Sequence, residues 1–218
     1  MKYADQYKAV VQQFMDGLPE EAQGIVMKNF EAIMNADFGK NAPKVGDKAP
    51  DFTLPNVQGT DITLSELLAK GPLVINFYRG GWCPFCNLEF KSLHDILPEI
   101  QKSGATLVGI SPELPDNSLN TIEKHNLKFE VLSDVGNEIA NKYGLIMDVP
   151  EIIRPLYLQW GLDIPTINGD NSWQLPIPAT YVIDTDGTII SAYVNKNYTE
   201  RMEPDDIVTA LESLSEKA

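Results

Sequence analysis

Two cysteines, Cys83 and Cys86, are the only thiols in the chain, and they stand three residues apart. The segment Cys83-Pro84-Phe85-Cys86 follows the apolar run 73–78 and a Gly-Gly pair, so we expect it to begin a helix. Amide donors and the dipole at a helix N-terminus stabilise a thiolate, and residues three apart on a helix lie near disulfide geometry. The spacing therefore predicts that the pair opens and closes a local disulfide.

Two other readings of the cysteine pair compete with redox chemistry. A zinc site needs four ligands, and besides the cysteines the chain offers only His94 and His125. His94 lies about 12 Å beyond Cys86 along one helix, so we expect no metal site. The second alternative is a pair of inert buried thiols, and the preceding Gly-Gly turn argues for exposure instead.

The composition is that of an ordinary globular protein with an acidic surface. The 218 residues are 43% hydrophobic and 22% charged, and the net charge is −14. This charge repels phosphate backbones and anionic lipid, so we expect no nucleic-acid partner and no membrane role. We see no secretory signal and no apolar run near the roughly 20 residues of a membrane span. Two cysteines are too few for a secreted protein that is stabilised by many disulfides, so we expect a cytoplasmic location.

The hydrophobic pattern predicts two parts. Residues 1–43 form a helical extension with two amphipathic helices, which could pack on the main domain or on a second copy in a homodimer. Residues 44–218 alternate strands with helices, which predicts an α/β domain with a central sheet and helices on both faces. An unusual insert, 146–176, interrupts this order. The predicted strands are 73–78, 106–110, 129–132, 179–183 and 188–193.

Several segments of this domain resemble the peroxiredoxins, the alkyl hydroperoxide reductase and thiol-specific antioxidant superfamily. The resemblance covers roughly residues 44–215 and is carried by 46–55, by Phe77-Tyr78 and by 86–90. The stretch 79–86 resembles a peroxiredoxin-like branch with a thioredoxin-type Cys-x-x-Cys motif. The resemblance implies a thioredoxin-like mixed sheet, no cofactor, a peroxide substrate, and thioredoxin or a small thiol as the reductant.

The resemblance also implies roles for single residues. Cys86 falls on the peroxidatic cysteine, and Glu89 matches the glutamate that follows it. Peroxiredoxins position the peroxide with a proline, a threonine and a later arginine, where this chain has Arg79, Cys83 and Pro178. The arginine is thus absent from its usual position. Pro178 instead resembles the cis-proline of thioredoxins, although a proline at a strand start is equally an edge feature.

Several residues outside the Cys-x-x-Cys motif are candidates for the site. Arg79 could lower a thiol pKa or hold a peroxide oxygen, or it could be a solvated surface charge. Trp82 precedes Cys83 as in thioredoxins, and we expect it to shield one side of the site. The insert carries Trp160 and Trp173, and it could form a wall over the cysteines or a satellite core.

Three functions follow from these patterns. The leading hypothesis is a thiol-dependent peroxidase for hydrogen peroxide or organic hydroperoxides, in which Cys86 attacks and Cys83 resolves the sulfenic acid to a disulfide. The alternative is a dithiol–disulfide oxidoreductase acting on protein or small-molecule disulfides, in which Cys83 attacks. The third is a non-enzymatic redox-sensing or binding module. With no third cysteine, resolution must come from Cys83 or from an external thiol.

Overall fold

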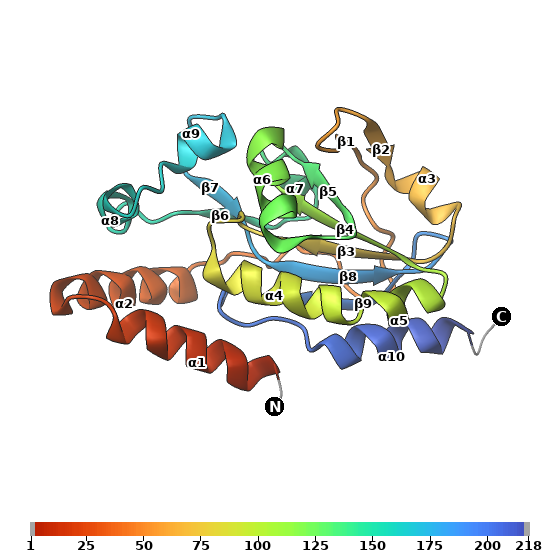
Figure 1. Ribbon diagram of the computed structural model, residues 1–218, viewed down its shortest axis with the longest axis horizontal. Helices are drawn as coiled ribbons and strands as arrows, with labels where there is room; N and C mark the ends of the chain where they lie inside the picture. The colour runs from red at the N-terminus through yellow and green to blue at the C-terminus, as the bar shows by residue number, and fades with distance from the viewer. Residues whose placement is uncertain (1–2, 216–218) are drawn as a thin grey trace.

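A five-stranded mixed sheet lies at the centre of the structure, a computed structural model that describes residues 3–215 (Figure 1). The strand order is β5-β4-β3-β8-β9. The first three of these are parallel to one another, whereas β8 is antiparallel to β3 and β9 is antiparallel to β8. The strands are β3 (Leu73–Phe77), β4 (Thr106–Ser111), β5 (Glu130–Ser133), β8 (Ala179–Ile183) and β9 (Ile189–Val194). The expected α/β architecture is confirmed.

One face of the sheet carries a layer of four helices. Helices α4 (Pro84–Asp95) and α6 (Pro115–His125) connect the parallel strands, and right-handed crossovers in one direction put both on the same face. They contact each other, and α5 (Leu97–Lys102) and α10 (Pro204–Ser215) complete the layer. Helix α4 therefore carries the cysteines along the surface of the sheet.

The opposite face is packed by aromatic rings. Side chains alternate along β3, so Phe77 points away from α4, and its ring centroid lies 4.9 Å from that of Tyr143. Tyr143 follows α7 (Glu138–Lys142) and also contacts Tyr181 of β8 at 5.4 Å. These rings fix β3 and β8 together beneath the helix layer.

Smaller elements surround this core. Strands β1 (Thr53–Pro55) and β2 (Asp61–Thr63) form a hairpin that leads into α3 (Leu64–Leu68), which the sequence patterns did not indicate. The insert 146–176 holds an antiparallel pair, β6 (Ile146–Asp148) with β7 (Gln174–Pro176). The helices of the insert are α8 (Arg154–Gln159) and α9 (Ile164–Asn168).

The two predicted N-terminal helices are α1 (Tyr3–Asp16) and α2 (Glu20–Asn35). Tyr7 and Ile33 join the main hydrophobic core, and Ala22 joins a second core cluster built mostly from the insert. Figure 1 shows the pair beside the N-terminal end of α4 and below α8. The boundary between 1–43 and 44–218 remains a prediction, because the helices share their core with the rest of the chain.

Prolines set two helix boundaries. The helix that starts at the cysteines is broken at Ile96, between α4 and α5, and Pro98 lies in the first turn of α5. A proline there costs no hydrogen bond, because the first helical amides have no partner within the helix. For the same reason α6 can begin at Pro115.

Candidate active site

The two cysteines occupy different positions at the start of α4. Cys83 is the N-cap residue and its carbonyl oxygen accepts the first helical hydrogen bond, while Cys86 lies one turn on. Both are reduced and buried, with 1% and 0% of their surfaces exposed. Cys83 lines a pocket of about 310 Å³, and Cys86 is not among the lining residues. One sulfur therefore faces the pocket and the other is sealed behind it.

A tight glycine turn places this pair. Gly80 has a φ of +147°, and a Cβ atom there would lie 2.2 Å from Nε1 of Trp82. A Cβ atom on Gly81 would lie 1.9 Å from Oγ1 of Thr121. The chain turns sharply from β3 into α4, and the side chains of Trp82 and Thr121 fill the space that a Cβ atom at either glycine would need. Trp82 is thereby held on the pocket wall beside Cys83.

Arg79 is buried in the pocket wall and is not a surface charge. Its Nη2 donates a 2.8 Å hydrogen bond to the hydroxyl of Tyr157. Its guanidinium carbon lies 4.2 Å from the ring centroid of Tyr198 and 5.1 Å from that of Trp82. Within residues 3–215 no carboxylate lies at ion-pair distance, so aromatic faces and one hydroxyl are its main partners.

This setting ionises Cys83. Burial opposes a charge there, but a hydrogen bond from Cys86 and the guanidinium groups of Arg79 and Arg201 outweigh it. Together they lower the pKa of the Cys83 thiol to about 5. Since the thiolate is the reactive form of cysteine, this lowered pKa makes Cys83 the candidate nucleophile of the reduced pair.

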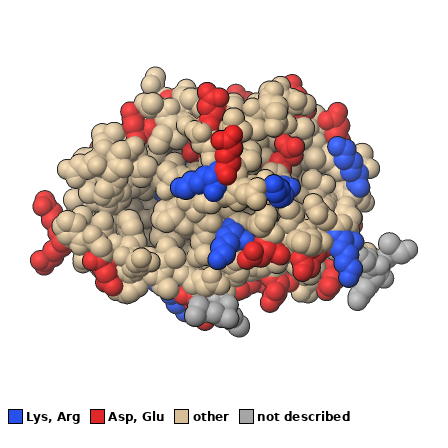
Figure 2. Space-filling model, in the orientation of Figure 1, with Lys and Arg blue, Asp and Glu red and all other residues tan. Residues whose placement is uncertain are grey.

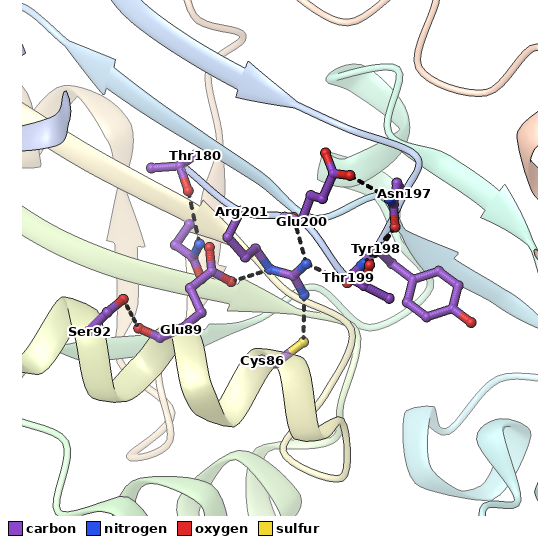
Figure 3. A network of polar contacts seen from close by, with 10 residues as sticks. Cys86, Glu89, Ser92, Thr180, Asn197, Tyr198, Thr199, Glu200 and Arg201 are labelled. Carbon is purple, nitrogen blue, oxygen red and sulfur yellow. Dashed lines mark hydrogen bonds and ion pairs between the residues drawn. The ribbon is translucent and has the colours of Figure 1, made fainter. Parts of the chain in front are cut away.

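Arg201 lies on the sealed side of the pair, in the segment between β9 and α10 (Figure 3). Its Nε donates to Glu89 at 2.7 Å, and its Nη2 donates to Sγ of Cys86 at 3.5 Å. Nη1 donates to the carbonyl oxygens of Tyr198 and Glu200. The ion pair is buried, with 1% and 4% of its side-chain surfaces exposed. An arginine therefore does contact the cysteine pair, from a position that the motif comparison did not indicate.

Cys86 remains a thiol despite this arginine. Burial raises the pKa of Cys86 well above its ordinary value, and its hydrogen bond to the Cys83 sulfur and the charge there add to the rise. Burial also raises the pKa of Glu89, although the facing Arg201 and a hydrogen bond from Asn76 offset part of this. Asn76 in turn donates to Oγ1 of Thr180, its register partner across β3 and β8.

Glu113 is a further buried carboxyl group near the site, and the sequence patterns did not indicate it. One oxygen accepts a 3.0 Å hydrogen bond from the amide of Gly81, and 3% of the residue is exposed. Burial raises the pKa of Glu113, the Gly81 amide lowers it, and the charge on Cys83 raises it, with a result of about 7. Glu113 and Cys83 are thus coupled across the glycine turn.

Pro178 is not a cis-proline. No cis peptide bond occurs within the described part of the chain, so the bond before Pro178 is trans. The preceding residue, Ile177, donates to the carbonyl of Leu145, which continues the extended pairing of β6 and β7 up to β8. Pro178 is buried in the two-residue link between β7 and β8 and is not among the residues that line the pocket.

The walls of the pocket come from segments far apart in the sequence. The N-terminal helices contribute Phe14, Leu18 and Val26, so they cover the site. The insert contributes Ile153, Tyr157, Trp160 and Leu162. Ile153 and Tyr157 of this wall also belong to the second hydrophobic core, together with Ala22, Leu156 and Ile164. The insert is therefore both a wall of the pocket and a satellite core.

The described residues contain neither a candidate metal cluster nor a helix that could span a membrane. Among residues 3–215 no three histidine, cysteine or acidic side chains gather as a metal site would need. His125 instead packs its ring against Phe90, with centroids 6.4 Å apart. No helix in the described range has the length and apolar character to cross a membrane.

Comparison with known proteins identifies the family. Residues 45–192, more than half of the chain, match the AhpC/TSA family. The chain belongs to the AhpC/TSA family. The family likeness expected from the motifs is therefore confirmed, and with it a peroxiredoxin-like oxidoreductase.

Curated relatives of this family member fall into two groups. A thiol-disulfide oxidoreductase ResA of Bacillus thuringiensis is 25% identical over 73% of this chain and 75% of its own length. A putative peroxiredoxin of Mycobacterium tuberculosis is 29% identical over 71% of this chain and 87% of its own. A chloroplastic peroxiredoxin Q of Gentiana triflora is 29% identical over 72% of this chain and 61% of its own.

Solved structures agree on the fold. The crystal structure of peroxidoxin BcpB from Mycobacterium tuberculosis matches 78% of this chain and 97% of its own, with a TM-score of 0.62 and 24% identity. A Xanthomonas campestris peroxiredoxin Q structure covers 74% of this chain and 90% of its own, with a TM-score of 0.55 and 22% identity. The thioredoxin-like sheet of the AhpC/TSA family is therefore confirmed.

Proposed function

We propose that the protein is a thiol-dependent peroxidase that reduces hydrogen peroxide or organic hydroperoxides through a Cys83/Cys86 disulfide cycle. The observation that carries this proposal is that Cys83, with its lowered pKa, and the buried Arg79 line one pocket. Cleavage of a peroxide O–O bond needs a strong nucleophile and positive charge near the departing oxygen. The likeness to peroxiredoxins supports the same chemistry.

The order of attack in this proposal differs from that implied by the motif comparison. There Cys86 attacks first, whereas the low pKa and pocket position of Cys83 favour Cys83 as the first nucleophile. The Cys83 thiolate attacks the terminal peroxide oxygen, and the O–O bond breaks. With one proton from solvent, the products are a Cys83 sulfenic acid and an alcohol, or water from hydrogen peroxide.

The second half of the cycle uses Cys86. Its thiol attacks the sulfenic sulfur, the S–S bond forms, and the sulfenic oxygen leaves as water with the thiol proton. Two equivalents of an external thiol then reduce the disulfide and are themselves oxidised to a disulfide. Because only 1% of Cys83 is exposed, beneath walls from the N-terminal helices and the insert, we propose a small thiol as the reductant in place of a protein such as thioredoxin.

Disulfide exchange is the second candidate function. The likeness to ResA proteins supports it, and so does the low pKa of Cys83, which is the attacking cysteine in that mechanism. However, only 1% of Cys83 is exposed beneath walls from the N-terminal helices and the insert. A protein disulfide needs those walls to move, whereas a peroxide enters the pocket directly. The cytoplasmic location and a homodimer stay predictions.

The single-cysteine variants separate these possibilities. Reduced Cys86→Ser and Cys83→Ser are mixed with hydrogen peroxide or cumene hydroperoxide, and sulfenic acid is trapped with dimedone and located by mass spectrometry. We expect fast trapping at Cys83 in Cys86→Ser and little at Cys86 in Cys83→Ser. The reverse pattern restores the Cys86-first order. Peroxide rates no faster than those of free cysteine, together with rapid mixed disulfides at Cys83, favour the exchange function.

A further inference from the structure

We propose that Tyr157, in the insert, is a positioning residue that holds the guanidinium of Arg79 away from the Cys83 sulfur. The charge of Arg79 then stays available to the oxygen that leaves when the peroxide is cleaved, instead of being paired with the thiolate. The role in turnover rests on the peroxidase function proposed above, whereas the contact between the two side chains is tested on the thiol alone.

Arg79 has one directional contact, and it is with Tyr157. A guanidinium group carries five N–H donors and no acceptor. The 2.8 Å bond from Nη2 to the Tyr157 hydroxyl is the one side-chain hydrogen bond that Arg79 makes within residues 3–215. The aromatic faces of Tyr198 and Trp82 attract the cation but do not fix the direction of its N–H groups. The hydroxyl of Tyr157 therefore sets where the guanidinium points.

Arg201 shows the other arrangement, in which an arginine is bonded to a sulfur. Its Nη2 donates to Sγ of Cys86 at 3.5 Å, while Nε and Nη1 are held by Glu89 and by two backbone carbonyl oxygens. Arg79 donates to neither sulfur within the described part of the chain, although its charge helps to lower the pKa of Cys83. The Arg79 guanidinium thus acts on the thiolate but is turned toward the insert.

Packing within the insert fixes Tyr157 itself. Tyr157 lies in α8 with 6% of its surface exposed, and its ring centroid lies 6.0 Å from that of Trp82 and 5.9 Å from that of Trp160. It belongs to the second hydrophobic core with Ile153 and Leu156. A side chain that is locked by packing can fix the geometry of the group that it bonds. The hydroxyl can therefore restrain the guanidinium.

The Cys83 thiolate is the alternative partner of Arg79. Among the described residues that line the pocket, Arg79 is the only one with a permanent charge, and Figure 2 shows uncharged surface in the hollow between α8 and the N-terminal helices. Without the Tyr157 hydroxyl, the strongest remaining attraction on Arg79 is that of the Cys83 sulfur. A contact ion pair lowers the pKa of a thiol, and the nucleophilicity of the thiolate falls with that pKa. Loss of the hydroxyl should therefore lower the pKa and slow the thiolate together.

The test uses Tyr157→Phe, which removes the hydroxyl and keeps the ring. The midpoint of Cys83 ionisation is followed by thiolate absorbance at 240 nm, and the rate of alkylation by iodoacetamide is measured at pH 8. We expect the midpoint to fall by about 0.5–1 pH unit and alkylation to slow about two- to threefold. The other charged groups that face Cys83, which are Arg201, Glu89 and Glu113, are unchanged. A raised or unchanged midpoint overturns the proposal.

Two further variants separate positioning from a structural role. In Arg79→Met/Tyr157→Phe, loss of the hydroxyl should add nothing to the effect of Arg79→Met, because Tyr157 acts through Arg79. Tyr181→Phe is the matched control, since its buried hydroxyl has no partner within residues 3–215 and its ring packs against Tyr143 on the other face of the sheet. It should leave the midpoint and the alkylation rate unchanged. Additive shifts in the double variant overturn the proposal.

Peroxide kinetics test the role in turnover. Oxidation of Cys83 by hydrogen peroxide should slow about ten- to a hundredfold in Tyr157→Phe, more than alkylation, because the leaving oxygen also loses the guanidinium. A decrease no larger than that of alkylation overturns this role. If native Cys83 reacts with peroxide no faster than free cysteine while the midpoint and alkylation shift as expected, the proposed peroxidase fails and the positioning of Arg79 by Tyr157 stands.

Discussion

The two sides of the cysteine pair each carry one buried arginine, and the two arginines act differently. Arg201 donates to Cys86, yet it also faces the carboxylate of Glu89 at 2.7 Å. Arg79 lies beside Cys83 with aromatic rings and a hydroxyl as its partners. The pKa of Cys86 is raised and that of Cys83 is lowered to about 5.

The comparison shows that a nearby cation does not by itself decide the state of a thiol. At Cys86, burial and the charge on Cys83 outweigh the lowering effect of Arg201 on the pKa, and Glu89 raises the pKa further. At Cys83, the hydrogen bond from Cys86 and the charges of Arg79 and Arg201 outweigh burial. One sulfur is thus held as a thiol and the other as a thiolate.

The largest effect is expected when the buried ion pair between Arg201 and Glu89 is broken. Arg201→Met leaves the Glu89 carboxyl buried without its partner, and we expect the free energy of unfolding to fall by about 3–5 kcal/mol. Urea denaturation of the reduced protein measures this loss. In the double variant Glu89→Leu/Arg201→Met most of the loss should be recovered, because no unpaired charge remains. A double variant as unstable as Arg201→Met contradicts the ion-pair account.

A smaller effect is expected from the loss of Arg79, which changes the pKa of Cys83. Thiolate absorbance at 240 nm should persist in the native protein down to about pH 5, because the pKa of Cys83 is lowered to that value. Arg79→Met removes the cation, and we expect this midpoint to rise by about 1–3 pH units. Arg154→Met is the matched control, since Arg154 lies in the insert beside the exposed Glu151. An unshifted midpoint in Arg79→Met assigns the ionisation to Cys86, Arg201 and the helix start.

The smallest effect concerns Glu113, which adds negative charge near Cys83. With a pKa raised to about 7, Glu113 is neutral below that pH and charged above it. Its ionisation disfavours the Cys83 thiolate, so Glu113→Gln should remove an inflection near pH 7 from the peroxide rate profile. We expect a rate change at pH 8 of less than about tenfold, or 1.4 kcal/mol. An inflection that survives in Glu113→Gln belongs to another group.

Much of the fold followed from local patterns. Buried runs such as 73–78 and the three- and four-residue spacing of the helices predict elements from neighbouring residues alone. The position of the cysteines at the start of α4 is equally local, since it depends on a Gly-Gly turn and on Pro84. The hairpin β1–β2 was missed because strands of three residues show too few alternations to be recognised.

The site itself depends on contacts between distant residues. Arg201 lies 115 residues beyond Cys86, and only the docking of the segment after β9 brings the two together. The only hint of its role in the sequence was the rarity of arginine, since Arg201 is one of three in the chain. The covering role of Phe14 depends on how α1 packs, which no local pattern determines. The link that holds Pro178 is likewise placed by a tertiary contact, the hydrogen bond from Ile177 to Leu145.

The absence of side chains at Gly80 and Gly81 has a consequence for variation of this protein. Thr121 and the indole of Trp82 occupy the volume that even one methyl group at these positions would need. Directed evolution of new specificities must therefore leave this dipeptide unchanged and draw its diversity from α1, α2 and the insert. Library designs that randomise the loop before the cysteines would mostly yield misfolded clones, whereas those that randomise the walls would sample altered ligand preference.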